Sequence, residues 1–383
     1  MNQTDPGFGI YIHWPFCKAK CPYCDFNSHV NRAIDPSIFA DGLVKELSYM
    51  RELSGPRALT SIFFGGGTPS LMPPAAVNQI LNQIDNLWSI PDLTEITLEA
   101  NPTSIEGRNF EGYRQAGVNR ISVGVQALND KDLARLGREH SSQEALEAYR
   151  LARKIFPRTS FDLIYARPNQ TQAEWEKELK LALYEEPDHL SLYQLTIEEG
   201  TPFYNLHATG KLKVPSDDYS ADLYDLTQEI TTAHGFRTYE VSNHARPGDE
   251  CRHNLVYWRY GDYVGVGPGA HGRLTISNEK ISTYCTPEPN QWLQKVNQHH
   301  HAIVDRQILS KLDQAHEYLL MGLRLSEGIS LSRYASYSNR TISEKTLNDL
   351  IEDDLILISA DMLRATSKGR PMLNAIIAKL ASL

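Results

Sequence analysis

Three cysteines near the N-terminus have a spacing that could hold a metal cluster. Cys17, Cys21 and Cys24 form a C-x3-C-x2-C pattern, and no fourth cysteine lies near them. A cubane iron–sulfur cluster usually takes four thiolate ligands, so three cysteines would leave one iron without a protein ligand. An open metal position can bind a small molecule and do chemistry, as in catalytic zinc sites. The alternative is a zinc knuckle in which His13 or His29 completes the ligand set.

The residues around the cysteines resemble the radical S-adenosylmethionine (SAM) superfamily. The stretches Tyr11-Ile-His-Trp-Pro-Phe-Cys17 and Cys21-Pro-Tyr-Cys-Asp-Phe-Asn27 are similar to one branch of it. That branch contains oxygen-independent coproporphyrinogen III oxidase and HemW-type haem chaperones. The resemblance implies that the three cysteines hold a [4Fe–4S] cluster whose fourth iron is chelated by SAM. It extends along nearly the whole chain.

A glycine-rich segment, Phe63-Phe-Gly-Gly-Gly-Thr-Pro69, follows the second expected strand. Glycine lacks a Cβ atom, so the backbone here can approach a ligand closely and expose its polar groups to it. A tight turn between a strand and a helix is the simpler explanation when the segment is taken alone. The resemblance implies instead that Gly66, Gly67 and Thr68 contact the amino group of SAM.

The resemblance also assigns to the SAM site a set of polar side chains, most of them at or beyond the ends of strands. Carboxylates there can bind a ribose or an ammonium group, and an arginine can donate two hydrogen bonds to a carboxylate. Each residue, taken singly, could equally be a capping or solvated side chain. Where the family usually has Gly-Leu-Pro, this chain has Ala166-Arg-Pro168, which puts the shape of that loop in doubt. The set comprises Tyr11, Tyr23, Glu99, Gln126, Arg138 and Asp162.

A second motif, Cys251-Arg-His-Asn-Leu-Val-Tyr-Trp258, places a histidine among aromatic residues. Histidine is a common axial ligand of haem iron, and aromatic rings can pack on a porphyrin face. A packed loop or core is the simpler interpretation of these residues by themselves. The resemblance implies that haem binds to His253, Asn254, Tyr257 and Trp258.

The glycine-rich stretch Arg259–Gly272 follows this motif and predicts a loop that approaches the cofactor closely. It contains Gly269-Ala-His271, which the family pattern includes. Cys251 is a conceivable thiolate ligand, although a lone cysteine is more often packed or free. Cys285 has no assigned role.

Two features favour a haem chaperone over the decarboxylating oxidase of the same branch. The oxidase typically has a further cysteine where this chain has Phe26, and a long segment before its first strand, whereas few residues precede Tyr11 here. We therefore expect a chaperone that binds haem and passes it to unidentified acceptor proteins. The oxidase is the alternative, and a radical SAM enzyme with an unrelated substrate is a weaker one. No catalytic residue is assigned, and the sequence leaves open whether SAM is cleaved.

The composition limits the class of protein. The chain has 383 residues with 38 basic and 47 acidic side chains, so its net charge of −9 does not favour nucleic acid. Five cysteines, three of them clustered, argue against a disulfide framework and fit a reducing cytoplasm. We expect no signal peptide at Met1–Gly7 and no transmembrane helix, because no apolar run reaches about 18 residues. Peripheral membrane contact and a homodimer stay open.

Short apolar runs alternate with amphipathic ones, which predicts parallel strands joined by helices. Asp35 and Pro36 predict the start of one helix, and Pro74 predicts the start of a second. Six such units predict an open, TIM-like (β/α)6 barrel, which the resemblance also implies, with working residues at the carboxyl ends of strands. The strands are expected at Gly9–His13, Ser61–Phe64, Glu95–Ala100, Arg120–Val125, Ser160–Tyr165 and Leu190–Thr196.

The last part of the chain has a different pattern. Helical periods at Leu312–Leu323 and Ser343–Ile351 precede an expected short hairpin and a final helix. We predict a radical SAM barrel over residues 1–304, which also carries the haem motif, and a small winged-helix-like α+β domain over residues 305–383. The acidic stretch Glu352-Asp-Asp354 argues against DNA binding, so we interpret this domain as a packing unit or a lid.

Overall fold

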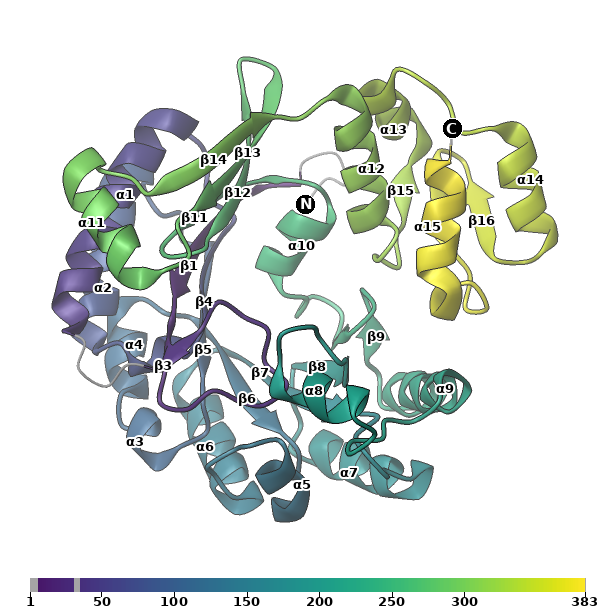
Figure 1. The fold of residues 1–383 in the computed structure, drawn as a ribbon, viewed down its shortest axis with the longest axis horizontal. Helices are drawn as coiled ribbons and strands as arrows, with labels where there is room; N and C mark the ends of the chain where they lie inside the picture. Colours follow the sequence, from purple (N-terminus) through teal and green to yellow (C-terminus); the bar gives the residue numbers. More distant parts are fainter. Residues whose placement is uncertain (1–5, 31–34, 383) are drawn as a thin grey trace.

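The computed structural model describes residues 6–30 and 35–382. A sheet of 12 strands curves around the centre of the molecule, and helices cover its outer face (Figure 1). Residues 1–5, on which most of the expectation about a signal peptide falls, lie outside the described residues. Among the described residues, no helix has both the length and the apolar character that a membrane span requires.

Six parallel strands in the middle of the sheet confirm the predicted open barrel. They lie side by side in chain order and are β1 (Phe8–Trp14), β4 (Ser61–Gly66), β5 (Glu95–Ala100), β6 (Arg120–Gln126), β7 (Arg158–Tyr165) and β8 (His189–Gln194). The main helices between and after them are α1 (Pro36–Ser54), α2 (Pro74–Trp88), α4 (Phe110–Ala116), α6 (Ser142–Ile155), α7 (Gln172–Tyr184) and α9 (Asp217–Ala233).

The sheet continues beyond both ends of this barrel, which the sequence pattern did not predict. On one side it continues through β11 (Asp262–Val266), β12 (His271–Ile276), β13 (Glu279–Cys285) and β14 (Ile303–Ile308), and on the other through β10 (Asn243–Ala245) and β9 (Arg237–Thr238). β11 pairs in parallel with β1. The loop predicted over Arg259–Gly272 is therefore wrong for part of its length, because Val264 and Val266 are buried in a strand.

Helix α1 illustrates how local sequence positions the elements. Asp35 accepts a hydrogen bond from the backbone N–H of Ser37 (2.9 Å) and Pro36 lies in the first turn, so the predicted helix start is confirmed. Leu43 and Leu47 are buried in the core that α1 shares with the outer face of the sheet. Because side chains alternate along a strand, neighbouring strand residues face the interior of the barrel instead.

Helix α10 (Arg252–Trp258) lies on the opposite side of β1 and β4 from α1 and α2 (Figure 1). It packs against β1, β4 and β11. The predicted haem motif is therefore part of a helix on the inner face of the sheet.

The C-terminal part confirms the predicted small α+β unit with a hairpin. It contains α12 (Lys311–Gly322), α13 (Leu331–Ser338), α14 (Glu344–Glu352), α15 (Leu373–Ala381) and a sheet of β15 (Ile329–Ser330), β17 (Met362–Ala365) and β16 (Ile356–Ser359). The sequence pattern did not predict α13 or β15. Strand β14 runs across the expected boundary between residues 304 and 305 and pairs with β13, so the division of the chain at that point stays a prediction.

Candidate functional site

The three clustered cysteines lie in the segment that follows β1, at the carboxyl end of the barrel strands. Cys17 ends the short strand β2 (Phe16–Cys17), and Cys17, Cys21 and Cys24 are all partly exposed. The hydroxyl of Thr68 donates a hydrogen bond to Sγ of Cys17 (3.3 Å), and Nη1 of Arg138 donates one to Sγ of Cys21 (3.5 Å). Burial raises the pKa of Cys17, and the donor directed at its sulfur opposes this by favouring the thiolate form that a metal cluster requires.

The two histidines that could complete a zinc knuckle already have hydrogen-bond partners. The ring nitrogens of His13 are bonded to the hydroxyl of Tyr11 (3.0 Å) and to the carbonyl oxygen of Asn27 (2.9 Å). Nε2 of His29 is bonded to Oδ1 of Asn27 (2.9 Å). Zinc binding by either histidine would break these bonds or need the remaining nitrogen of His29. Three thiols without a histidine are the number of protein ligands that a cluster with one open iron requires.

The glycine-rich segment after β4 packs directly against the cysteine segment. The backbone N–H groups of Gly67 and Thr68 donate to the carbonyl oxygens of Trp14 (2.7 Å) and Phe16 (2.9 Å). Gly66 has a φ of +110°, and a Cβ atom on Gly67 would lie 2.8 Å from the carbonyl oxygen of Phe16. These two N–H groups are thus used within the protein and not exposed to a ligand. The glycines instead allow the backbone of this segment to approach the cysteine segment closely, which brings the hydroxyl of Thr68 to Sγ of Cys17.

Two carboxylates, Glu99 of β5 and Asp162 of β7, are partly buried among the barrel strands. Burial, reinforced by the charge of Asp162, raises the pKa of Glu99 to about 8. Burial also raises the pKa of Asp162, whose Oδ1 accepts a hydrogen bond from the hydroxyl of Ser122 (3.2 Å). A cationic ligand would favour the charged form of both groups. The pair therefore fits a positively charged ligand better than an anionic one.

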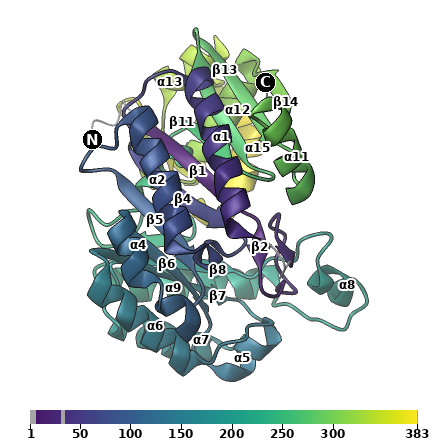
Figure 2. The ribbon, with the colours of Figure 1, turned by 90° about the vertical axis from the view of Figure 1, so that its left-hand side faces the viewer.

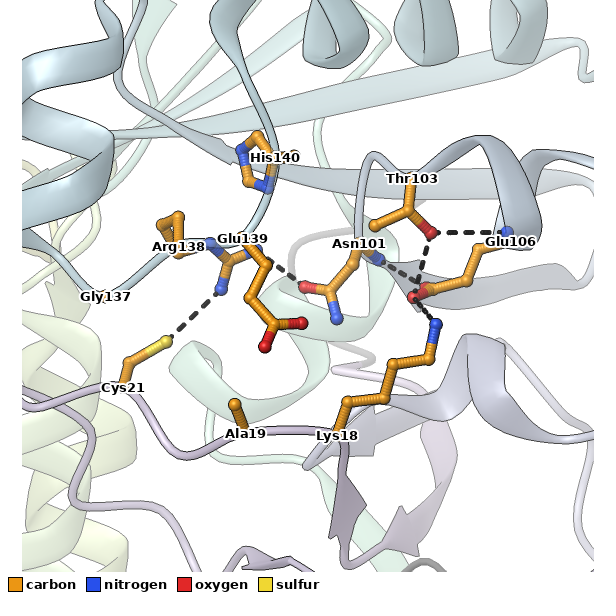
Figure 3. Close-up of a pocket in the computed structure, with 10 residues that line it drawn as sticks. All are labelled: Lys18, Ala19, Cys21, Asn101, Thr103, Glu106, Gly137, Arg138, Glu139 and His140. Carbon is orange, nitrogen blue, oxygen red and sulfur yellow. Dashed lines mark hydrogen bonds and ion pairs between the residues drawn. The ribbon is translucent and has the colours of Figure 1, made fainter.

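Arg138 joins the cysteine segment to the ends of β5 and β6 (Figure 3). Besides its bond to Cys21, its Nη2 donates to Oδ1 of Asn101 (2.6 Å) and to the carbonyl oxygen of Gly124 (3.0 Å). Its buried Nε has no acceptor among the described residues. A buried donor without a partner marks a position where the carboxylate of a ligand would be stabilised.

A cavity of about 40 Å³ lies beside Arg138 and extends to Lys18 and Glu106 (Figure 3). This volume accommodates a few water-sized groups, so it suits the polar end of a ligand and not a whole nucleoside. Asn101, which lines the cavity, was not among the predicted residues. It directly follows β5 at the carboxyl end of a barrel strand, and that position was the signal that could have identified it.

The structure gathers the other predicted SAM residues at the same mouth of the barrel. Gln126 has a φ of +70° and ends β6 where its pairing with β7 is irregular. A Cβ atom on Gly124 would lie 2.9 Å from Nε2 of Gln126, so the lack of a side chain at Gly124 leaves room for that of Gln126. The side chain of Tyr23 contacts that of Arg138. Gln126 and Tyr23 thus both lie next to groups that Arg138 contacts.

The predicted haem residues lie near the starts of the strands, away from the cysteines. His253 is 1% exposed, and its ring nitrogens are bonded to the hydroxyls of Ser61 (2.8 Å) and Tyr257 (2.7 Å). Burial lowers the pKa of His253 to about 3, so the ring is neutral. Asn254, Tyr257 and Trp258 are partly buried. In this conformation the motif is a packed group, and an axial bond from His253 requires one of its two hydrogen bonds to break.

The two remaining cysteines are buried and each donates to a carboxylate. Sγ of Cys251 donates to Glu95 (3.4 Å), and Sγ of Cys285 donates to Glu46 (3.6 Å). Burial raises the pKa of Cys251 to about 12, so its thiol is protonated. Neither cysteine is close to the clustered three in the sequence, and each has a structural partner.

Glu46 of α1 is a buried carboxylate that connects three parts of the fold. It accepts hydrogen bonds from the backbone N–H groups of Gly267 (2.8 Å) and Ala302 (2.8 Å) and from Nε1 of Trp292 (2.9 Å). Gly267 belongs to the glycine-rich stretch after β11, and a Cβ atom on it would lie 2.4 Å from the carbonyl oxygen of His13. The part of that stretch after β11 therefore packs against the cysteine segment, whereas β11 itself packs against the helix α10 that carries the haem motif.

Three partly exposed thiols at the carboxyl end of an open (β/α)6 barrel, beside partly buried carboxylates, define a radical SAM protein. The model of the Radical SAM superfamily matches residues 11–182, and the model of the HemN C-terminal domain matches residues 309–372. Sequence comparison narrows this class. The mitochondrial radical S-adenosyl methionine domain-containing protein 1 of Bos taurus is 37% identical over 384 residues, which cover 97% of this chain and 87% of that protein.

The haem chaperone HemW of Haemophilus influenzae is 36% identical over 382 residues, which cover 97% of each chain. HemW of Escherichia coli is 35% identical, again over 97% of each chain. The chain belongs to this family of HemW and radical S-adenosyl methionine domain-containing protein 1. The solved structure of coproporphyrinogen III oxidase (HemN) from Escherichia coli has the same fold, with a TM-score of 0.82, 24% identity and coverage of 99% of this chain and 91% of that one.

Proposed function

We propose that this chain is a haem chaperone on a radical SAM scaffold, which binds haem and passes it to acceptor proteins. The similarity to HemW of Haemophilus influenzae over 97% of both chains carries this proposal. The position typical of a further oxidase cysteine holds Phe26, which is 60% exposed and offers no ligand atom. The free thiols at the site fit a reducing compartment such as the cytoplasm.

Cys17, Cys21 and Cys24 would hold the [4Fe–4S] cluster, with SAM at the open iron. Bound together, the cluster and SAM supply one-electron chemistry. Glu99 and Asp162 would face the cationic part of SAM, and the free Nε of Arg138 would meet its carboxylate. The remaining residues proposed to shape this site are Tyr11, Tyr23, Gly66, Gly67, Thr68 and Gln126.

Haem would be received at α10, with His253 as the axial ligand and with Asn254, Tyr257 and Trp258 around it. Because Nε2 of His253 is bonded to the hydroxyl of Tyr257, uptake of haem would need that hydroxyl to leave and the buried ring to become accessible. Haem would thus select a conformation in which α10 has moved away from the barrel.

Reconstitution with iron and sulfide, followed by haem titration with and without SAM, tests this function. The Soret band should report saturable haem binding that His253→Ala weakens and that the exposed control His299→Ala leaves unchanged. Iron content should fall in Cys24→Ala and stay constant in Cys285→Ala. Unchanged haem affinity in His253→Ala would refute that residue as the ligand, and absence of haem binding by the parent protein would refute the function.

A separate assay distinguishes the chaperone from the oxidase. The reconstituted protein is incubated anaerobically with a reductant, SAM and coproporphyrinogen III, and the porphyrinogens are analysed. We expect the substrate to be recovered unchanged. Formation of protoporphyrinogen IX would favour the oxidase.

A further inference from the structure

A second cavity, of about 430 Å³, lies between α5 (Asp130–Arg135), the loop that follows β7, and the segment around α8 (Pro202–Ala208). It is distinct from the candidate SAM site, although neighbouring residues of one turn border both, Leu136 on this side and Arg138 on the other. In Figure 2 the segment with α8 and the strand β2 extend on the same side of the sheet. The volume is in the range of small-molecule sites.

Part of the lining of this cavity is apolar. Phe203, 5% exposed, forms its buried base, while Leu206 at its rim is 38% exposed. Leu136 and Leu212 also line it and belong to the same small hydrophobic cluster as Phe203. A buried apolar base with an exposed apolar rim leaves hydrocarbon surface that an apolar ligand would cover.

The rest of the lining is basic, in a chain whose net charge is −9. Four cationic side chains, Arg135, Arg167, Lys211 and Lys213, line the cavity with one carboxylate, Asp132. That carboxylate is already paired with Arg167 (3.1 Å) and Arg135 (3.3 Å). Within the part of the chain that the structure describes, the two lysines form no ion pair. The cavity therefore has excess positive charge.

Arg167 adds a buried cation with one unsatisfied donor to this lining. It is 2% exposed, and its guanidinium donates to the carbonyl oxygen of Ile164 (2.7 Å) and to the carboxylate of Glu178. Its buried Nε, in contrast, has no acceptor among the described residues. Leaving such a donor unsatisfied costs about 1–3 kcal/mol. An oxygen atom of a bound carboxylate would satisfy it.

We infer that this cavity binds an apolar small molecule that carries a carboxylate. The carboxylate would lie near Arg167, Lys211 and Lys213, and the hydrocarbon part would cover Phe203 and Leu212. Fatty-acid anions and porphyrins with propionate side chains share this chemistry. The inference is independent of the proposed function, because a fatty acid would bind here without the cluster, SAM or haem iron.

Calorimetric titration of the full-length protein with decanoate and, separately, with iron-free protoporphyrin IX tests the inference and distinguishes the two sources. We expect saturable binding of at least one of them, weaker at high salt, and no binding of decan-1-ol, which lacks the charge. The double variant Lys211→Glu/Lys213→Glu should weaken binding at least tenfold. The matched variant Lys154→Glu/Lys177→Glu, on exposed helix positions, should bind like the parent.

Binding of decanoate alone would assign the site to fatty-acid anions, and binding of protoporphyrin alone to tetrapyrrole carboxylates. The inference would be overturned if neither ligand bound, or if the two double lysine variants lost affinity equally. Both variants change only exposed side chains, so loss of folding does not obscure the result, and far-UV circular dichroism verifies this. Because iron-free porphyrin forms no axial bond, its binding does not report on His253, and the two proposals can fail separately.

Discussion

The rings of His253 and Phe63 lie nearly parallel, with centroids 4.9 Å apart and an angle of 19° between their planes. Phe63 also stacks on Tyr11, at 6.3 Å and 24°, and the hydroxyl of Tyr11 is bonded to Nδ1 of His13 (3.0 Å). This row of rings connects the proposed haem residue with the segment that carries the cysteines. A movement of α10 that exposes His253 must therefore break the stacking on Phe63.

Tyr257→Phe should increase haem affinity several-fold. The substitution removes the hydroxyl that is bonded to Nε2 of His253 and keeps the ring that packs beside it. With that competitor gone, the nitrogen is free to bond haem iron. The dissociation constant is measured from the Soret titration, with Tyr263→Phe as the control because its ring packs on Tyr257. Weaker binding in Tyr257→Phe would assign the haem contact to the tyrosine oxygen.

Glu99→Gln should stabilise the ligand-free protein near pH 8. The pKa of about 8 lies above the usual 4.5, so the folded state binds more protons between these values and stability falls as pH rises through this window. A neutral amide has no such penalty, which is on the order of 4 kcal/mol at pH 8 for this shift. Thermal unfolding should therefore separate the two proteins at pH 8 and not at pH 4.

The same variant should bind SAM more weakly, because the charged form of Glu99 favours a cationic ligand. In the parent, SAM affinity should rise with pH up to about 8, since binding at lower pH requires Glu99 to lose its proton. Equilibrium dialysis measures both effects, and the exposed control Glu111→Gln should show neither. Equal stability of Glu99→Gln and the parent at pH 8 would contradict burial as the cause of the raised pKa.

Glu46→Gln should destabilise the fold by about 2–4 kcal/mol in urea denaturation, because an amide nitrogen that replaces one of the two oxygens cannot accept the hydrogen bonds made to it. These are the bonds from Gly267 and Trp292 at one oxygen, or those from Ala302 and Cys285 at the other. Glu52→Gln, an exposed position on the same helix, should change stability by less than about 0.5 kcal/mol. Iron incorporation should also be slower, since the stretch with Gly267 packs on the cysteine segment. An unchanged unfolding midpoint would show that the carboxylate is dispensable.

Ala166→Gly should stabilise the protein by about 0.5–1 kcal/mol. Ala166 has a φ of +55°, a conformation that is strained for alanine and unstrained for glycine, which the family usually has there. The gain is reduced by the greater freedom of glycine in the unfolded chain. Ala375→Gly, an exposed position within α15, should instead cost up to about 1 kcal/mol. Destabilisation by Ala166→Gly would show that the loop needs the methyl group.

Local patterns were sufficient to predict the barrel, because a strand such as β4 contains a short apolar run and a helix such as α1 has a cap and an apolar period, all within contiguous residues. Strand β11 was missed, since Gly265 reduces its strand propensity and its partner β1 lies far away in the sequence. Tertiary pairing, which no short window contains, stabilises this strand.

The sequence predicts the order in which the strands carry the candidate site residues. It does not predict which residues contact them in the fold. Glu46 was missed because an acidic residue in a helix is normally solvated, and its burial depends on Gly267 and Trp292 far along the chain. The burial of His253 could not be predicted either, because the sequence does not show that α10 packs on the inner face of the barrel sheet.

Asn27 follows the cysteines by three residues, and its side-chain amide donates to the carbonyl oxygens of Pro268 and Pro287, 241 and 260 residues further on. During synthesis the thiols emerge from the ribosome long before these partners exist. The segment with the three cysteines is thus made well before the residues that enclose it. Delivery of iron and sulfide must then either wait for the late residues or meet a segment that is still open to oxidants.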